Sequence, residues 1–248
     1  MGLALRHKMK HQKLAAEKAA AEVENKPQTA SASKQVSVTG SALTVPFEIQ
    51  ALKDGFDADL SIVQSLHGDE QRLPVKKDLI EKYQPLFDFY IQNFKNFAHL
   101  DVMFYLLLWR TDVLGITSEY LSWELAIERG LTSPERFKRN VQDFYLDSIV
   151  VYFDDCEKSG DFNGKFERSA LESVISKIDT GEYGTNAPLK AKLFKRYGLF
   201  KMKGGELQDL EVAKKYFEKA LGLDKGVGVK KLIKEIEGME SNGQGENK

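Results

Sequence analysis

The sequence predicts an all-α fold in which helical hairpins pack into a bundle. An uninterrupted apolar run at residues 102–109 would make a helix hydrophobic on every side, and such a helix has to lie centrally among several neighbours. Elsewhere between residues 46 and 239, apolar residues recur at the three- and four-residue spacings of amphipathic helices. The period-two alternation that is typical of strands does not occur in this part of the chain.

The central element is predicted to be a helical hairpin over residues 99–131, which contains both tryptophans, Trp109 and Trp123. Its apolar run is far shorter than the ~20 residues needed to cross a bilayer, so we expect a core helix and no membrane anchor. Gly115 supplies the turn between the two helices.

Two charged residues, Arg110 and Asp112, end the apolar run. A charge at the edge of so apolar a helix needs a partner that offsets its desolvation. We therefore expect Arg110 to pair with a nearby carboxylate, with Asp112 as the candidate, and to fix the turn into the second helix. The alternative is that both residues face water.

Helices are expected on both sides of this hairpin. Pro85 lies inside one of them and should kink or split it. Ser133 and Pro134 have the residue types of a helix start, with serine as the cap and proline at the first position. The predicted helices outside the hairpin span residues 47–66, 74–94, 141–158, 171–178 and 227–239.

The C-terminal part contains a pattern of small and large residues. Tyr197 and Gly198, followed by Ala213, Phe217 and Ala220, resemble the packing positions of one tetratricopeptide helical pair. Such a pair is packing chemistry only and predicts no ligand. The predicted organisation is a basic N-terminal arm (1–22), a flexible linker (23–44), a helical core domain (45–185), a C-terminal tetratricopeptide-like segment (186–240) and a disordered tail (241–248).

Net charge indicates no particular partner, because 36 lysines and arginines nearly balance 37 carboxylates. The cations gather in two segments, residues 6–18 and 190–203, and the second has no acidic residue. Clustered cations bind DNA phosphates, although such runs are more often solvated helix faces. The candidate DNA-binding residues are Arg6, Lys8, Lys10, Lys13, Lys18, Lys190, Lys192, Lys195 and Arg196.

Several enzyme classes lack their motifs here. The nearest approach to a phosphate-binding loop, at Gly160 to Lys165, has the wrong spacing, and no Gly-x-Ser-x-Gly sequence occurs. Cys156 is the only cysteine, which excludes an intramolecular disulfide and fits a reducing compartment. Because the first residues lack the apolar segment of a secretory signal, we expect a soluble cytoplasmic protein.

Two groups of carboxylates are candidate metal ligands of a nuclease. On a helix, the adjacent Asp154 and Asp155 point about 100° apart and cannot chelate one ion together. We interpret both groups as solvated faces and expect no cofactor, with Mg²⁺ required only if the protein is an endonuclease. The groups are Asp54, Asp57 and Asp59, and Asp154, Asp155 and Glu157.

Four stretches carry a resemblance to a known family: Arg6-His7-Lys8-Met9, DVMFYLLLWRTD at 101–112, AIERGLT at 126–132, and GLFKMKGG with the block that follows it. In them the chain resembles the small terminase subunits of temperate tailed phages, the gpM-like type that is also labelled the terminase endonuclease subunit. The likeness covers most of the chain, in the same order.

The resemblance implies a role in phage DNA packaging. Such a subunit binds the packaging or cohesive-end site on concatemeric double-stranded DNA, forms a homo-oligomer and recruits the large ATPase subunit, in the cytoplasm of the bacterial host. An alternative is an endonuclease subunit that cuts at the cohesive-end site, and the catalytic and metal-binding residues of that activity are unknown. A further alternative is a helical-repeat scaffold that binds only proteins.

Overall fold

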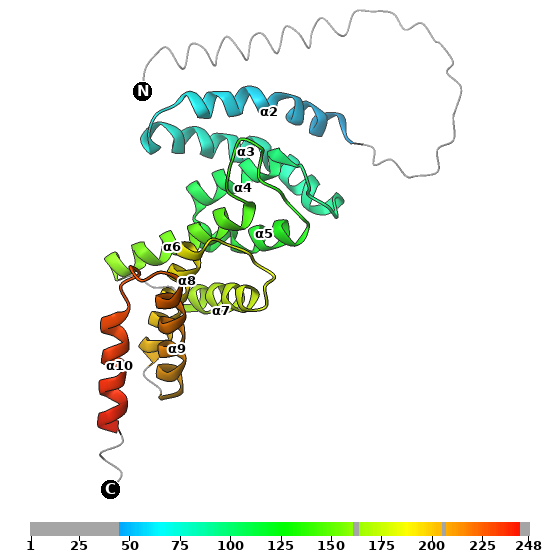
Figure 1. The fold of residues 1–248 in the computed structure, drawn as a ribbon. Coiled ribbons are helices and arrows are strands. Elements are labelled where there is room, and N and C mark those ends of the chain that lie inside the picture. Colours follow the sequence, from blue (N-terminus) through cyan, green and yellow to red (C-terminus); the bar gives the residue numbers. More distant parts are fainter. Residues whose placement is uncertain (1–44, 161–163, 205–206, 244–248) are drawn as a thin grey trace, which may run out of the picture. The chain divides into compact units, whose positions relative to one another are not determined.

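The computed structural model describes residues 45–160, 164–204 and 207–243. Within these ranges all regular secondary structure is helical, with nine helices and no strand, which confirms the all-α prediction (Figure 1). The predicted arm and linker, with Arg6, Lys8, Lys10, Lys13 and Lys18, lie outside the described residues. The helices are α2 (Phe47–Ser65), α3 (Asp69–Asn93), α4 (Asp101–Leu114), α5 (Ile116–Glu128), α6 (Val141–Ser159), α7 (Gly164–Asp179), α8 (Ala187–Gly204), α9 (Leu207–Leu223) and α10 (Lys230–Gly243).

Helix α4 is the central element, as its apolar run predicts. It packs between α3 and α5, and its buried residues are drawn from every side of the helix. Phe104 is fully buried and meets the rings of Trp123, Phe137 and Phe144 at centroid distances of 5.1–6.2 Å. These edge-on and tilted contacts tie α4 to α5, to α6 and to the segment between them.

The turn between α4 and α5 is made at Gly115, whose φ of +83° lies in the left-handed region that favours glycine. The predicted hairpin is therefore present. Trp123 in α5 donates a hydrogen bond from its indole nitrogen to the Thr111 hydroxyl of α4 at 2.8 Å, which adds a polar tie between the two helices.

Two local features differ from the predictions. Helix α3 is not split at Pro85, because Pro85 is exposed and water can reach the carbonyl that loses its partner, and the predicted kink stays a prediction. Residues 131–140 form no helix: the Ser133 hydroxyl donates to the Arg139 carbonyl at 2.7 Å, and Phe137 is held by its aromatic contacts. Packing in the core thus overrides the helix-start pattern.

The predicted C-terminal pair is present as α8 and α9. A Cβ atom added at Gly198 would lie 2.5 Å from Cε1 of Phe217, so glycine permits the close approach of the two helices. Helix α10 packs on α9, and a small cluster forms there from Leu210, Ala213, Phe217, Val229 and Ile236. The main core continues from α2 to α9. The predicted domain boundaries stay predictions.

None of the described helices is both long enough and apolar enough to span a bilayer.

Candidate nucleic-acid interface

Arg110 makes the ion pair that its position predicts, but with a different carboxylate. Its Nε and Nη2 atoms donate to the two carboxylate oxygens of Glu119 in α5, both at 2.9 Å, and Nη1 donates to Gln84 in α3 at 2.6 Å. Asp112 instead pairs with Lys76 of α3. The proposed pairing with Asp112 was wrong because two residues along a helix point about 200° apart.

This pair fixes the start of α5 against α4, as expected for Arg110. The Glu119 side chain is 2 % exposed and that of Arg110 16 %, so both charges are largely removed from water. Trp109 is also buried and stacks on Phe56 of α2 at 5.4 Å. Trp109 and Arg110 therefore hold the core together and are not available to a ligand.

The cations predicted on α8 fall into two groups. Arg196 forms ion pairs with Asp154 and Glu157, both on α6, and its side chain is 13 % exposed. The hydrogen bond from Arg196 is the main cause that lowers the pKa of Glu157. Lys195 donates to the Val227 carbonyl at 3.1 Å. These two cations tie α8 to its neighbours.

Lys190 and Lys192 remain on the outside of α8. Lys192 is exposed and makes no ion pair with any described residue. The ammonium group of Lys190 lies 5.5 Å from the centre of the Phe194 ring. The structure therefore leaves these two among the α8 candidates in contact with solvent, and their role in DNA binding stays a prediction.

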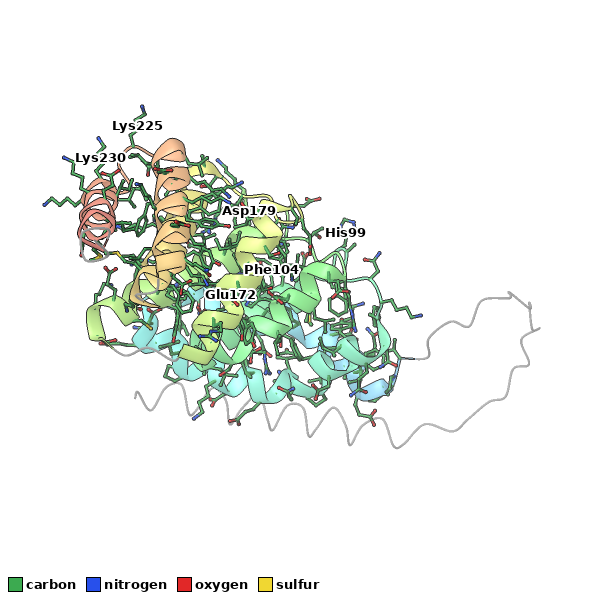
Figure 2. The ribbon with its side chains drawn as sticks, turned by 90° about the horizontal axis from the view of Figure 1, so that it is seen from below. His99, Phe104, Glu172, Asp179, Lys225 and Lys230 are labelled. Carbon is green, nitrogen blue, oxygen red and sulfur yellow. The ribbon has the colours of Figure 1, made fainter. Side chains whose placement is uncertain are left out.

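A third basic segment, residues 225–234, was not among the segments predicted from the sequence. It has four lysines and no acidic residue, and this composition could have indicated a basic surface. In the sequence, only its apolar residues enter the prediction of a helix. All four side chains are exposed, and none forms an ion pair with the described part of the chain. Figure 2 shows two of them, Lys225 and Lys230, projecting away from the helices on the same side. We call Lys225, Lys230, Lys231 and Lys234 the C-terminal lysine patch.

The patch surrounds the start of α10, which begins at Lys230 and has no acidic residue in its first turn. A helix N-terminus carries partial positive charge, so Lys230 and Lys231 destabilise this end of the helix. A bound phosphate would reverse the effect, because it would meet both the lysines and the free backbone N–H groups. Gly228, at φ +79°, leads the chain into this turn.

Except for Asp57, the carboxylates that are candidate metal ligands have other partners among the described residues. Asp154 and Glu157 pair with Arg196, and Asp155 pairs with Lys158 at 3.0 Å. Asp59 accepts a hydrogen bond from the Tyr83 hydroxyl at 2.6 Å. Within residues 45–160, 164–204 and 207–243, no three His, Cys, Asp or Glu side chains are placed to hold one metal ion.

Comparison with known proteins places the chain in a family. The family model described as phage small terminase subunit matches residues 55–182, which run from α2 to just beyond α7. Neither the curated proteins nor the solved structures gave a match. Since the family model covers more than half of the 248 residues, the chain belongs to the phage small terminase subunit family.

Proposed function

We propose that this protein is the DNA-recognising subunit of a phage packaging machine. It binds the packaging site on concatemeric double-stranded DNA, assembles as a homo-oligomer and recruits the large terminase ATPase subunit in the cytoplasm of the bacterial host. Family membership supports the packaging role. The observation that carries the DNA-binding part is the C-terminal lysine patch, whose four exposed charges have no carboxylate partner in the described residues.

The expected mode of binding is contact with the phosphate backbone. Each lysine that neutralises a phosphate releases counterions, so affinity falls with salt by a log–log slope of about −0.9 per contact. The four patch lysines, with Lys190 and Lys192 on α8, supply such contacts. Side chains that already form ion pairs within the protein, such as Arg196, would have to break them first.

The test is fluorescence anisotropy with packaging-site DNA across a salt series. Replacing the four patch lysines by alanine should weaken binding and make the salt slope shallower by about 3 to 4. A matched variant replaces four exposed lysines elsewhere that also lack ion pairs, and it changes net charge equally. Equal losses in both variants would contradict the proposed interface. The matched set is Lys53, Lys77, Lys95 and Lys138.

The basic arm at residues 1–22 is proposed as a second DNA contact. Its cations are predicted from the sequence to order on phosphates. A protein that lacks residues 1–22 should bind packaging-site DNA more weakly and with a shallower salt slope. Unchanged affinity would remove the arm from the interface and leave the lysine patch untouched.

Two assays separate this proposal from its alternatives. Incubation with cohesive-end DNA and Mg²⁺, without the large subunit, should give no cleavage, whereas an endonuclease would cut. A cutting activity that Asp57→Ala abolishes would favour the endonuclease. A scaffold that binds only proteins would show no DNA affinity even at low salt. Native mass with and without cognate DNA gives the subunit number of the free and bound assemblies.

A further inference from the structure

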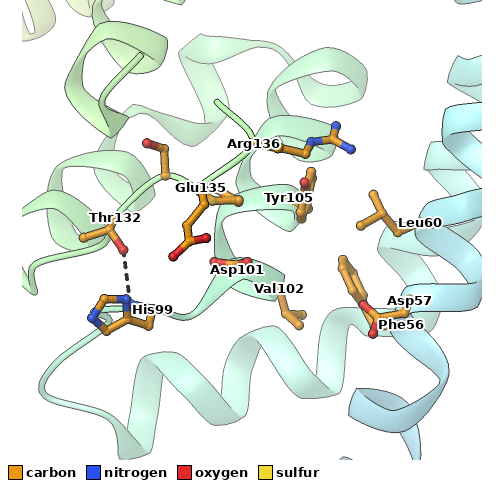
Figure 3. Close-up of a pocket in the computed structure, with 12 residues that line it drawn as sticks. Phe56, Asp57, Leu60, His99, Asp101, Val102, Tyr105, Thr132, Glu135 and Arg136 are labelled. Carbon is orange, nitrogen blue, oxygen red and sulfur yellow. Dashed lines mark hydrogen bonds between the residues drawn. The ribbon is translucent and has the colours of Figure 1, made fainter. Parts of the chain in front are cut away.

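A hollow of about 410 Å³ lies on a part of the protein that the proposed DNA contacts do not use (Figure 3). It is formed by α2, by the start of α4 and by the irregular segment 132–136. Its size falls within the range of about 300–1,000 Å³ that is typical of ligand sites. Its apolar wall is made by Phe56, Leu60, Val102, Tyr105 and Pro134.

Three carboxylates, Asp57, Asp101 and Glu135, also line the hollow, and none of them has an ion-pair partner among the described residues. The cation beside them, Arg136, is turned to aromatic rings: its guanidinium lies 5.2 Å from the centre of Tyr105 and 4.7 Å from that of Phe137. In the lining, the carboxylates therefore outnumber the single arginine by two.

Tyr105 gives an independent indication that a polar ligand belongs here. The residue is only 5 % exposed, yet its hydroxyl forms no hydrogen bond with any described residue. Burial raises the pKa of Tyr105; Arg136 opposes this, and Asp101 and Asp57 add to it. Since Tyr105 lines the hollow, a ligand that displaces water from this hydroxyl has to offer it a hydrogen bond.

The chemistry of the lining selects the ligand. Three carboxylates repel phosphate, so the hollow does not bind DNA. A purely apolar ligand would desolvate the carboxylates without pairing them. A metal ion would need three converging donors, which the described residues do not offer. A guanidinium or ammonium group on an aliphatic stem satisfies the carboxylates, while its stem covers Leu60 and Val102.

We propose that this hollow is a docking site for a basic side chain, arginine or lysine, presented by a partner protein. Charge complementarity with the unpaired carboxylates carries the choice of partner. The hollow has room for the residues on either side of the cation as well as for the side chain itself. The proposal is independent of DNA binding, because it uses neither the lysine patch nor α8.

The test uses the full-length protein and a capped Gly-Arg-Gly peptide, with the neutral isostere Gly-citrulline-Gly as the matched ligand. Binding is followed by NMR shifts of the backbone amides of residues 132, 133 and 135–137. It is also followed by tryptophan fluorescence, to which Trp109 contributes because it stacks on Phe56 beside the hollow. The arginine peptide should shift these signals, and the citrulline peptide should bind at least about tenfold more weakly, because charge-assisted hydrogen bonds contribute about 1.5–3 kcal/mol.

Two variants of residues that line the hollow test the contribution of a carboxylate and of the tyrosine hydroxyl to binding. The Glu135 side chain is exposed and has no partner among the described residues, so Glu135→Gln should leave the stability of the protein unchanged. The same variant should weaken binding of the arginine peptide about tenfold. Tyr105→Phe removes only the hydroxyl and should weaken binding a few-fold. The matched control is Glu81→Gln on the exposed face of α3, and it should leave binding unchanged.

Equal binding of the arginine and citrulline peptides would overturn the proposal. So would equal losses in Glu135→Gln and Glu81→Gln, or binding of free putrescine in preference to the arginine peptide.

Discussion

The ion pair between Arg110 and Glu119 makes a sharp prediction about stability. Arg110→Met keeps an unbranched apolar stem of similar length and removes the guanidinium. The carboxylate of Glu119 then loses two hydrogen bonds of 2.9 Å while its side chain stays 98 % buried, and Gln84 loses its donor. Removal of one partner from a buried ion pair costs about 3–5 kcal/mol, since the remaining charge is left uncompensated.

The assay is urea unfolding of the wild type and of three variants. Arg110→Met should lower the free energy of unfolding by about 3–5 kcal/mol. The double variant Arg110→Met/Glu119→Leu should recover most of this loss, because it removes both charges. Lys158→Met breaks an exposed pair with Asp155 and should cost less than about 1 kcal/mol.

Two results would refute this reasoning. One is an Arg110→Met protein within about 1 kcal/mol of the wild type, which would mean that water reaches Glu119 and screens it. The other is a double variant that is less stable than Arg110→Met, which would assign the effect to packing of the two stems and not to the unpaired charge.

Two further predictions concern the C-terminal helices. Gly198→Ala should destabilise the protein by about 1–2 kcal/mol in urea unfolding, because the overlap with the buried Phe217 ring outweighs the ~1 kcal/mol that alanine gains in a helix. Adding Phe217→Leu should restore part of the loss. A Gly198→Ala protein that is more stable than the wild type would contradict the close contact. The pKa of Asp179 is lowered, since hydrogen bonds from Tyr216 and Lys219 outweigh the opposing effect of burial. The ionised Asp179 should therefore stabilise the fold at pH values above its unfolded pKa, and this stabilisation should be lost as the pH falls through the lower folded pKa. The difference in unfolding free energy between the wild type and Asp179→Asn should shrink on acidification. A difference that stays constant with pH would contradict this prediction.

The sequence was most informative where burial alone decides the structure. The run at 102–109 predicted a central helix because no amphipathic face exists to turn toward water, and α4 is that helix. The turn at Gly115 followed from the residue type, and the structure has it at a positive φ. Small and large residues at helical spacing likewise predicted a packed helical pair, in which the structure places Gly198 against Phe217.

Prediction failed where partners come from distant segments. Local charge patterns suggested Asp112 for Arg110, whereas the fold brings Glu119 and Gln84 to it from two other helices. Similarly, the sequence does not show that Arg196 is paired, because its partners on α6 lie about forty residues earlier in the chain. A charge run in a sequence does not show which members are already paired in the folded protein.

The hollow beside α4 could not have been predicted for a related reason. Ser133 and Pro134 have the residue types of a helix start, but contacts of Phe137 with Phe104 and Phe144 hold that segment in an irregular conformation. The segment then forms one side of the hollow together with α2 and α4, an arrangement that only the tertiary structure reveals.

The most direct test of DNA binding through the C-terminal lysine patch is acetylation footprinting of lysines with mass spectrometry, with and without packaging-site DNA at low salt. Lys225, Lys230, Lys231 and Lys234 are exposed and should react readily in the free protein and be protected by DNA. The equally exposed Lys77 and Lys95 should react at the same rate in both states. Unchanged reactivity of all four patch lysines in a saturated complex would contradict the proposed interface.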